Sequence, residues 1–204
     1  MKRIKGSHWL FPVLTLAVLL CLRLSDPFVV EIARLKGFDL LQRSAERFRS
    51  EKVILIDINE EAVNVEGQWP WPRGRMADLI DRLRKANAGA IVLPILFSEP
   101  DRFGEDDRLA ESISKTRVVV AQNATLFKSL GGVSRGVSRI GDPTKWLFSW
   151  PSAIGPIPLI GNQAKGVGMT NLAPELDGVV RRMPLAVNSG GQIFPSIVLE
   201  AMRV

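Results

Sequence analysis

The sequence predicts an α/β fold with a mostly parallel central sheet and flanking helices. Three short apolar runs rich in β-branched residues read as strands buried on both faces: VILID (53–57), AIVLPILF (90–97) and VVVA (118–121). Helical patterns separate these runs, and strand alternating with helix implies parallel pairing through right-handed crossovers. Two further predicted features complete the fold class, a C-terminal antiparallel hairpin and an N-terminal membrane helix.

Length and charge limit the possibilities further. The chain has 204 residues, 46% of them apolar, which is enough for one good core. Its formal charge of +6 is unevenly distributed, because residues 1–24 contain four basic residues and no acidic one. The remaining 180 residues hold 23 basic and 21 acidic side chains. This near balance speaks against a nucleic-acid partner. We therefore expect one folded domain, residues 25–204, after an N-terminal segment of residues 1–24.

That N-terminal segment resembles an export signal. A basic leader, MKRIKGSH, precedes an apolar run from Trp9 to Leu22 that would span about 21 Å as a helix, short of the ~30 Å hydrocarbon core. The segment shows no small-residue cleavage site. We favour an uncleaved signal anchor in the cell inner membrane, with residues 25–204 on the extracytoplasmic side. A cleaved signal peptide and a buried core helix are the alternatives.

Cysteine and histidine are too scarce for several kinds of site. The single cysteine, Cys21, lies inside the apolar run, and the single histidine, His8, precedes it. A disulfide within the chain, a His/Cys zinc cluster and histidine catalysis in the folded part are therefore ruled out. No metal site or catalytic residue is predicted, and the cofactor, if any, is unknown.

Other elements follow from periodicity and turn residues. We expect a helical region over residues 25–50 with a break at Gly37. A second helix is expected to follow the proline-rich segment at 69–72 and to have its apolar face at 76–83. Two more helices are expected, one over residues 107–115 and one from Pro195 to the end. Two strands, GVGMTNL (166–172) and VVRRMPLAV (179–187), are expected to be joined by a turn at PELDG, with NSGG as another turn. Residues 122–156 read as irregular, with GGVSRGVSR as a surface insertion.

The segment WPWPRGR (69–75) is the most distinctive local feature. Trp69 and Trp71 each precede a proline, which favours extended backbone, and Pro72 suits the first turn of the next helix. The segment is therefore predicted to be a rigid strut between strand and helix. Its tryptophans either pack on the core or line a crevice.

A crevice is expected at the carboxyl edge of the sheet, where ligands bind in open parallel sheets. Asp57 ends the first predicted strand, Arg73 opens the following helix, and Glu99 and Asp101 follow the second strand. Such a cluster could bind a cation or polar ligand, or could form a structural ion pair with helix caps. The candidate ligand-binding residues are Asp57, Trp69, Trp71, Arg73, Glu99 and Asp101.

Several segments, in this order, carry a family resemblance: VILIDIN, GQWPWPRGRMADLIDRL, ILFSEPD, GMTNLAPELDGVVRRMPL and FPSIVLEAM. Over residues 37–203 the chain resembles the second type of CHASE domain, an extracellular sensory module of cyclases and histidine kinases. The resemblance implies a periplasmic or extracellular sensor for signal transduction, with an N-terminal membrane helix, further membrane helices after the domain, and a cytoplasmic output domain. It identifies no ligand.

The chain departs from the family pattern in two places. Pro94 stands where the family usually has an aspartate in its second strand, so we expect the strand to be bulged or unpaired on one side. If the family uses a pair of aspartates for its ligand, Asp57 has lost its partner here, which speaks against a metal-type site. The sequence also ends at Val204, before any membrane helix or output domain, so we expect it to be truncated. By analogy with the family, the intact protein is expected to form a homodimer.

Two other functions compete with a sensor of an unknown small-molecule or protein stimulus. An exported hydrolase would use Asp57, Glu99 and Asp101 around a divalent cation. It lacks a nucleophile elbow, and GNQAKGV (161–167) has valine where a phosphate loop requires lysine. A cell-envelope protein-binding module would use the aromatic stretch WLFSWP (146–151), which could instead be a lid on the sheet edge.

Overall fold

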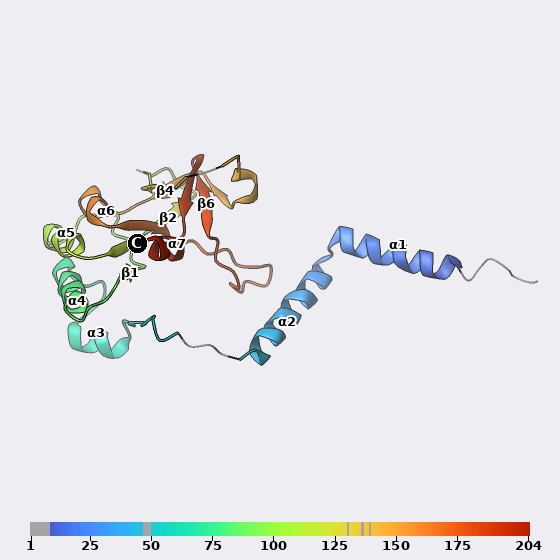
Figure 1. Ribbon diagram of the computed structural model, residues 1–204, viewed down its shortest axis with the longest axis horizontal. Coiled ribbons are helices and arrows are strands. Elements are labelled where there is room, and N and C mark those ends of the chain that lie inside the picture. Colours follow the sequence, from blue (N-terminus) through green and yellow to red (C-terminus); the bar gives the residue numbers. More distant parts are fainter. Residues whose placement is uncertain (1–8, 47–49, 130, 136, 139) are drawn as a thin grey trace, which may run out of the picture. The chain divides into compact units, whose positions relative to one another are not determined.

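The structure is a computed structural model that describes residues 9–46, 50–129, 131–135, 137–138 and 140–204 (Figure 1). The chain divides into two compact units, each described here by itself. One contains the chain up to Ile56 together with Leu176–Gly178, and the other contains Asp57–Glu175 and Val179–Val204. The basic leader (1–8), the end of the helix expected up to residue 50 (47–49) and two positions of the expected insertion (136 and 139) lie outside the described residues.

Two helices form the N-terminal part, α1 (Leu10–Ser25) and α2 (Phe28–Ser44). They are separate because Pro27 has no N–H to continue the helix and Asp26 takes a left-handed conformation with φ 39°. Helix α2 confirms the helical character expected here. The expected break at Gly37 is wrong, because α2 continues through this residue and a single glycine costs a helix only about 1 kcal/mol.

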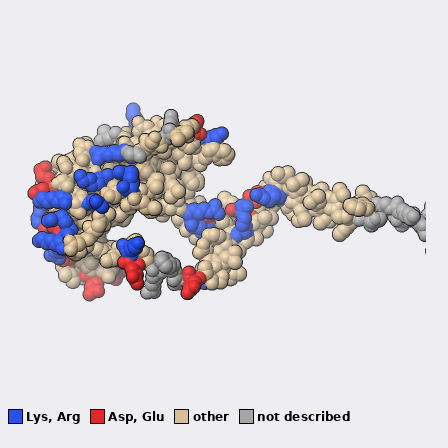
Figure 2. Space-filling model, viewed as in Figure 1, with Lys and Arg blue, Asp and Glu red and all other residues tan. Residues whose placement is uncertain are grey.

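Helix α1 is apolar along its length and buries none of its side chains. Figure 2 shows it almost entirely without charged side chains. In the described part of the chain, no single helix is both long and apolar enough to cross a membrane. Only α1 and α2 taken together satisfy that test, by length and composition, across a bend of 80°. A membrane helix within residues 1–24 therefore stays a prediction.

Residues 53–57 do not form the strand that their composition predicts. Their backbone is irregular, and Val53, Ile54 and Leu55 are 74%, 84% and 90% exposed. An apolar β-branched run is typical of a buried strand, but such a strand also needs a neighbour to pair with. The first predicted strand is wrong, and Asp57 does not stand at the carboxyl end of a strand.

The larger unit is built on a sheet with a parallel centre. Strand β2 (Val118–Thr125) pairs in parallel with β1 (Ile91–Leu93) on one side and with β5 (Gly166–Met169) on the other. Its far end pairs antiparallel with β4 (Ser152–Ile154). Parallel pairing of β1 and β2 is confirmed. The run 90–97 forms a strand only over its first part, because Pro94 cannot donate a hydrogen bond to the ladder.

Helices cover both faces of this sheet. On one face lie α4 (Arg73–Lys85), α5 (Asp106–Ser114) and α6 (Pro158–Gln163). Apolar side chains of these helices and of β1, β2 and β5 form the largest core cluster. Its members include Met76, Ile80, Leu93, Leu109, Ile113, Val118, Val120, Ile160 and Val167. On the other face, α7 (Ile197–Arg203) packs on the alternate residues of β2, Val119 and Ala121. The alternation follows from the two-residue period of a strand. The helices expected at 76–83 and 107–115 are confirmed.

A second sheet lies beside the first. Strand β6 (Ala186–Ser189) pairs in parallel with β3 (Ser149–Trp150) and antiparallel with β7 (Gln192–Pro195). A C-terminal antiparallel hairpin is present, but it joins β6 to β7 at Gly190 and Gly191, whose positive φ values suit a two-residue turn. The hairpin expected across PELDG is wrong, because β5 pairs with β2 and not with β6. The last helix starts at Ile197 and not at Pro195, which belongs to β7.

Two short helices complete the unit. Helix α3 (Glu60–Glu66) is capped by Asn59, whose side chain accepts a hydrogen bond from the Ala62 N–H at 2.9 Å. The 3₁₀ turn η2 (Thr144–Trp146) lies within the segment 122–156 that was expected to be irregular. Most of that segment does lack regular structure between β2 and β3. Its described part is nevertheless held by specific hydrogen bonds, given below.

Candidate functional site

Arg73, the first residue of α4, is the centre of a polar network. Its Nε donates to Asp106 Oδ1 at 3.3 Å, and its Nη2 donates to the Glu99 carbonyl oxygen at 3.2 Å. The guanidinium lies over the Phe97 ring, 4.4 Å from the centroid. The Arg73 and Asp106 side chains are only 14% and 13% exposed. Charge, hydrogen bonding and stacking therefore all hold Arg73 in one place.

The loop from Asp101 to Asp106 continues this network. Asp106 Oδ2 accepts from the Asp101 N–H at 2.8 Å, and Asp101 Oδ2 accepts from the Glu105 N–H at 3.3 Å. Glu105 in turn accepts the Gly74 N–H, an otherwise unpaired donor in the first turn of α4, at 3.0 Å. A carboxylate at a helix N-terminus is favourable because of the helix dipole. Glu105 thus caps helix α4, and Asp101 and Asp106 hold the loop between them in place.

The WPWP segment connects α3 to α4, and not a strand to a helix as predicted, and it has a cis peptide bond between Trp69 and Pro70. Trp71 packs against the main core and donates from its indole Nε1 to the Gly67 carbonyl at 2.7 Å. Trp69 meets Trp71 edge to face at 5.6 Å and is 37% exposed. Arg102 donates to the Pro70 carbonyl at 3.4 Å. One tryptophan is therefore structural, whereas the other keeps part of its ring open to solvent.

The six candidate residues have different surroundings. Arg73, Glu99 and Asp101 meet in one network, although Glu99 enters through its backbone oxygen. Asp57 is exposed, and no hydrogen bond or ion pair joins it to the other described residues. Among the described residues, no group of His, Cys, Asp and Glu could hold a metal ion. The carboxylates required by the hydrolase alternative do not form such a group.

An apolar groove lies elsewhere on this unit and contains none of the six residues. It encloses about 620 Å³ between the loop 137–147, the β6–β7 hairpin and α7. Its lining is mostly apolar (Val137, Ile140, Pro143, Leu147, Ala186, Ile193, Pro195, Leu199, Met202), with Ser138, Glu200 and Arg203 as polar members. A shallower hollow of about 440 Å³ adjoins it and shares Val137 and Ile193. Binding pockets for small ligands commonly have this size and apolar character.

Glu200 holds α7 to the sheet beneath this groove. Its side chain is buried and accepts the Val167 N–H of β5 at 3.3 Å. It also accepts from Arg203 at 2.8 Å and 2.6 Å. These hydrogen bonds raise the pKa of Arg203 above its ordinary value, against the opposing effect of burial. Sequence analysis did not select Glu200, although an acid inside the apolar run FPSIVLEAM was a signal.

Two amide side chains hold the irregular segments at the carboxyl end of β2. The buried Gln122 donates to the Val133 carbonyl at 2.9 Å and accepts the Val133 N–H at 2.8 Å. Asn171 bonds the N–H and the carbonyl of Ala124 at 2.6 Å and 3.0 Å. The described part of GGVSRGVSR is therefore held at Val133, beside Gly131, which forms a bridge to Ile154 of β4. Sequence analysis did not predict either amide contact.

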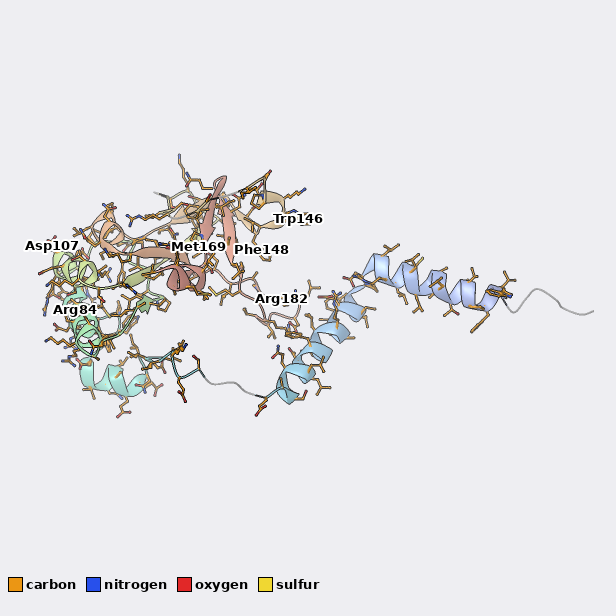
Figure 3. The ribbon with its side chains drawn as sticks, viewed as in Figure 1. Arg84, Asp107, Trp146, Phe148, Met169 and Arg182 are labelled. Carbon is orange, nitrogen blue, oxygen red and sulfur yellow. The ribbon has the colours of Figure 1, made fainter. Side chains whose placement is uncertain are left out.

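The aromatic stretch 146–151 is only partly packed. Trp150 packs against the core under the second sheet, whereas Trp146 and Phe148 are 80% and 55% exposed. Figure 3 shows both side chains in the region of β3 and β6. The expectation of a lid packed on the sheet edge therefore fits Trp150 but not Trp146 or Phe148.

These features together define an α/β domain in which polar side chains hold loops in place and an apolar groove lies beside the last helix. The chain belongs to the CHASE2 domain family, whose sequence model matches residues 13–204, nearly the whole chain. This confirms the resemblance drawn from the sequence. CHASE2 domains are extracellular sensory domains, typically membrane-associated, and are not catalytic. No curated protein and no solved structure matches the chain significantly.

Proposed function

We propose that this chain is the extracytoplasmic input domain of a bacterial membrane-bound signalling protein. Its membership of the CHASE2 family is the observation that carries the proposal. The proposed output is enzymatic or regulatory, lies in the cytoplasm and responds to a stimulus received by the larger unit. Signalling requires that the stimulus bind two states of the domain with different affinity.

The proposal includes an anchor in the cell inner membrane within residues 1–24. Helix α1 supports it, because its side chains are apolar and exposed and its only charged residue is Arg23 in the last turn. At about 1.5 Å per residue its 16 residues reach roughly 24 Å. Such a helix needs the snorkelling of a flanking arginine, or a thinned bilayer, to span the hydrocarbon core. The leader's positive charge favours a cytoplasmic N-terminus.

We assign the stimulus site to the apolar groove, and its ligand to small molecules with an apolar body and one polar head. The groove touches α7 at Leu199, Met202 and Arg203. A molecule bound there would contact the helix that Glu200 and Arg203 fasten to β5, and could change how that helix sits. The intact protein is proposed to be a homodimer, in which such a shift would act on paired output domains.

The groove assignment can be tested by thermal unfolding of the full chain in detergent, with decanoate, decanol and indole as probes. A probe at one hundred times its Kd adds about 2.7 kcal/mol, which raises Tm by roughly 5–10 °C for a domain of this size. In Ala186→Trp the indole fills the groove, so the Tm increase with the probes is expected to disappear.

The matched control is Leu185→Trp, the neighbouring residue, which is 66% exposed and does not line the groove. Its response to the probes should equal that of the wild type. An equal response in Ala186→Trp as well would place the binding site elsewhere and overturn the assignment.

The six residues selected from the sequence remain a second candidate site. The partly exposed Trp69 favours them, because an open aromatic ring suits the stacking of a flat ligand. Ligand-dependent stabilisation that is lost in Trp69→Ala and Asp57→Ala, but kept in Ala186→Trp, would support this site over the groove. Loss of this stabilisation in Arg73→Ala alone would not support the site, because Arg73 also holds the loop 99–106.

Binding of a protein stimulus is proposed as an alternative to a small molecule. The exposed Trp146 and Phe148 favour it, since large aromatics are enriched at protein interfaces. A double variant, Trp146→Ser with Phe148→Ser, should leave Tm nearly unchanged. A loss of signalling in that variant, with the probe response of the groove intact, would favour a protein partner.

A further inference from the structure

Three connections of the chain meet at the amino edge of the parallel sheet, and each carries a basic residue. Lys85 ends α4, which leads into β1, Arg117 precedes β2, and Lys165 precedes β5. Backbone hydrogen bonds bring these connections together: Ile91 N–H donates to the Arg117 carbonyl at 2.8 Å, and Lys165 N–H donates to the Val118 carbonyl at 2.9 Å. We call Lys85, Arg117 and Lys165 the basic rim.

The basic rim is exposed, and its side chains have no acidic partner among the described residues. All three residues are exposed, and none of them forms an ion pair with the residues that the structure describes. Arg203, at the end of α7, lies at the same edge, because its Nη2 donates to the Lys165 carbonyl at 2.9 Å. Its charge is matched by the buried Glu200. The net charge of this edge is therefore positive.

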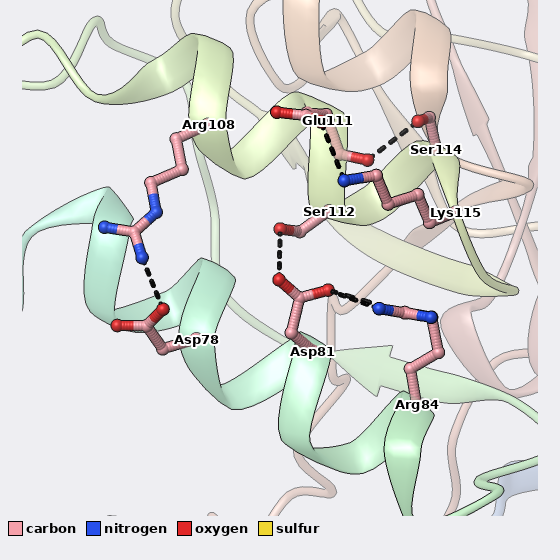
Figure 4. A network of polar contacts seen from close by, with 8 residues as sticks. All are labelled: Asp78, Asp81, Arg84, Arg108, Glu111, Ser112, Ser114 and Lys115. Atoms are coloured by element: carbon pink, nitrogen blue, oxygen red, sulfur yellow. Dashed lines mark hydrogen bonds and ion pairs between the residues drawn. The ribbon is translucent and has the colours of Figure 1, made fainter.

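The acids nearby are already engaged by other cations. Asp81 accepts from Arg84 and from Ser112, Glu111 accepts from Lys115, and Asp78 accepts from Arg108 (Figure 4). Each of these contacts lies within or between α4 and α5. At the carboxyl edge of the sheet, Asp101 and Asp106 are engaged in the Arg73 network. Figure 2 shows basic side chains gathered over the part of this unit that holds α4 to α6.

An apolar side chain adjoins the rim as well. Met202, one residue before Arg203, is 81% exposed. Lysine and arginine beside an exposed apolar side chain are the composition of surfaces that rest on anionic membranes. A free phosphate would engage the charges but would leave Met202 in water, and duplex DNA offers no apolar layer for it.

We propose that the basic rim is a docking surface for the phosphate headgroups of an anionic membrane. The interaction fixes the amino edge of the sheet, and with it the end of α7, at the bilayer surface. Lys85, Arg117 and Lys165 do not line the groove, although the neighbouring Met202 and Arg203 do. Changes to the three rim residues therefore test this inference separately from the stimulus site. The inference about the rim rests on the proposed membrane association in one respect, because that association makes the bilayer the source of the phosphates.

The test compares binding of the full chain to neutral phosphatidylcholine vesicles and to vesicles containing phosphatidylglycerol, by flotation at low and at high salt. The basic leader also favours anionic vesicles, but it is identical in the wild type and in the variants, so the change of the affinity ratio between them isolates the contribution of the rim. In the triple variant Lys85→Gln, Arg117→Gln and Lys165→Gln this ratio is expected to fall by about tenfold or more. In the wild type, high salt should remove the same preference.

A second triple variant changes the same amount of charge outside the rim. Arg102→Gln, Lys128→Gln and Lys145→Gln alter three exposed residues, and this variant should keep the wild-type preference. Equal loss in both triple variants would reduce the effect to net charge and overturn the proposal. It would also be overturned if the wild type showed no preference for phosphatidylglycerol, or if inorganic phosphate or duplex DNA bound the rim while the vesicles did not.

Discussion

Two glycines of strand β5 are required by the close approach of helix α7. Residues 166 and 168 are one strand period apart and face the same side. A Cβ on Gly168 would lie 2.3 Å from Ile197 Cα and 2.6 Å from Ile197 N, which are backbone atoms and cannot turn aside. A Cβ on Gly166 would lie 2.7 Å from the Glu200 carboxylate. The run GVGM therefore serves packing.

Gly168→Ala is accordingly expected to push α7 away from the sheet. Overpacking of this kind costs about 1–3 kcal/mol or more, and the loss should be visible as a lower midpoint in urea unfolding. Gly89→Ala is the matched control, because a Cβ there meets nothing within 4 Å and its φ is not in the left-handed region. A midpoint that falls equally in both variants would mean that the α7 contact is not the cause.

At the scale of elements, one buried side chain helps to hold the segment after β2. Gln122 is buried in the central strand, and both ends of its amide bond the Val133 backbone. Its Nε2 also donates to the Val167 carbonyl of β5 at 3.3 Å. A segment rich in glycine and serine has little apolar surface to bury, so these hydrogen bonds supply the order that packing does not.

Gln122→Leu keeps the volume of the side chain but leaves the Val133 N–H and carbonyl without partners. Each unsatisfied buried group costs about 1–3 kcal/mol, so a total loss of roughly 2–6 kcal/mol is expected in denaturant unfolding. Amide hydrogen exchange at Val133 should become faster at the same time. Gln163→Leu, at an exposed position of α6, is the control. Unchanged exchange at Val133 would show that another contact holds the segment.

At the scale of the whole molecule, the two units bury very different amounts of apolar surface. Three core clusters lie in the larger unit, whereas α1 buries no side chain and α2 buries only Leu35. The larger unit therefore has the core that independent folding requires. The apolar side chains of α1 need an environment other than water, and we propose that this environment is a membrane.

Residues 50–204 alone are thus expected to be soluble and to unfold in a single cooperative transition, with a Tm close to that of the full chain in detergent. The full chain without detergent or lipid is expected to associate through α1. Sedimentation velocity and thermal circular dichroism of both chains check this. A full chain that sediments as a monomer in plain buffer, or a shortened chain without a cooperative transition, would contradict the expectation.

The sequence alone determined the family, the α/β class, the helices α4 and α5, the parallel centre of the sheet and the stiff WPWP segment. These follow from local patterns, namely periodicity, proline geometry and ordered motifs. The tertiary structure decided what depends on distant partners: residues 53–57 are not a strand because pairing needs a neighbour, and Glu99 enters the Arg73 network by its backbone. Glu200, Gln122 and the groove were not predicted, because their surroundings come from segments far apart in the chain.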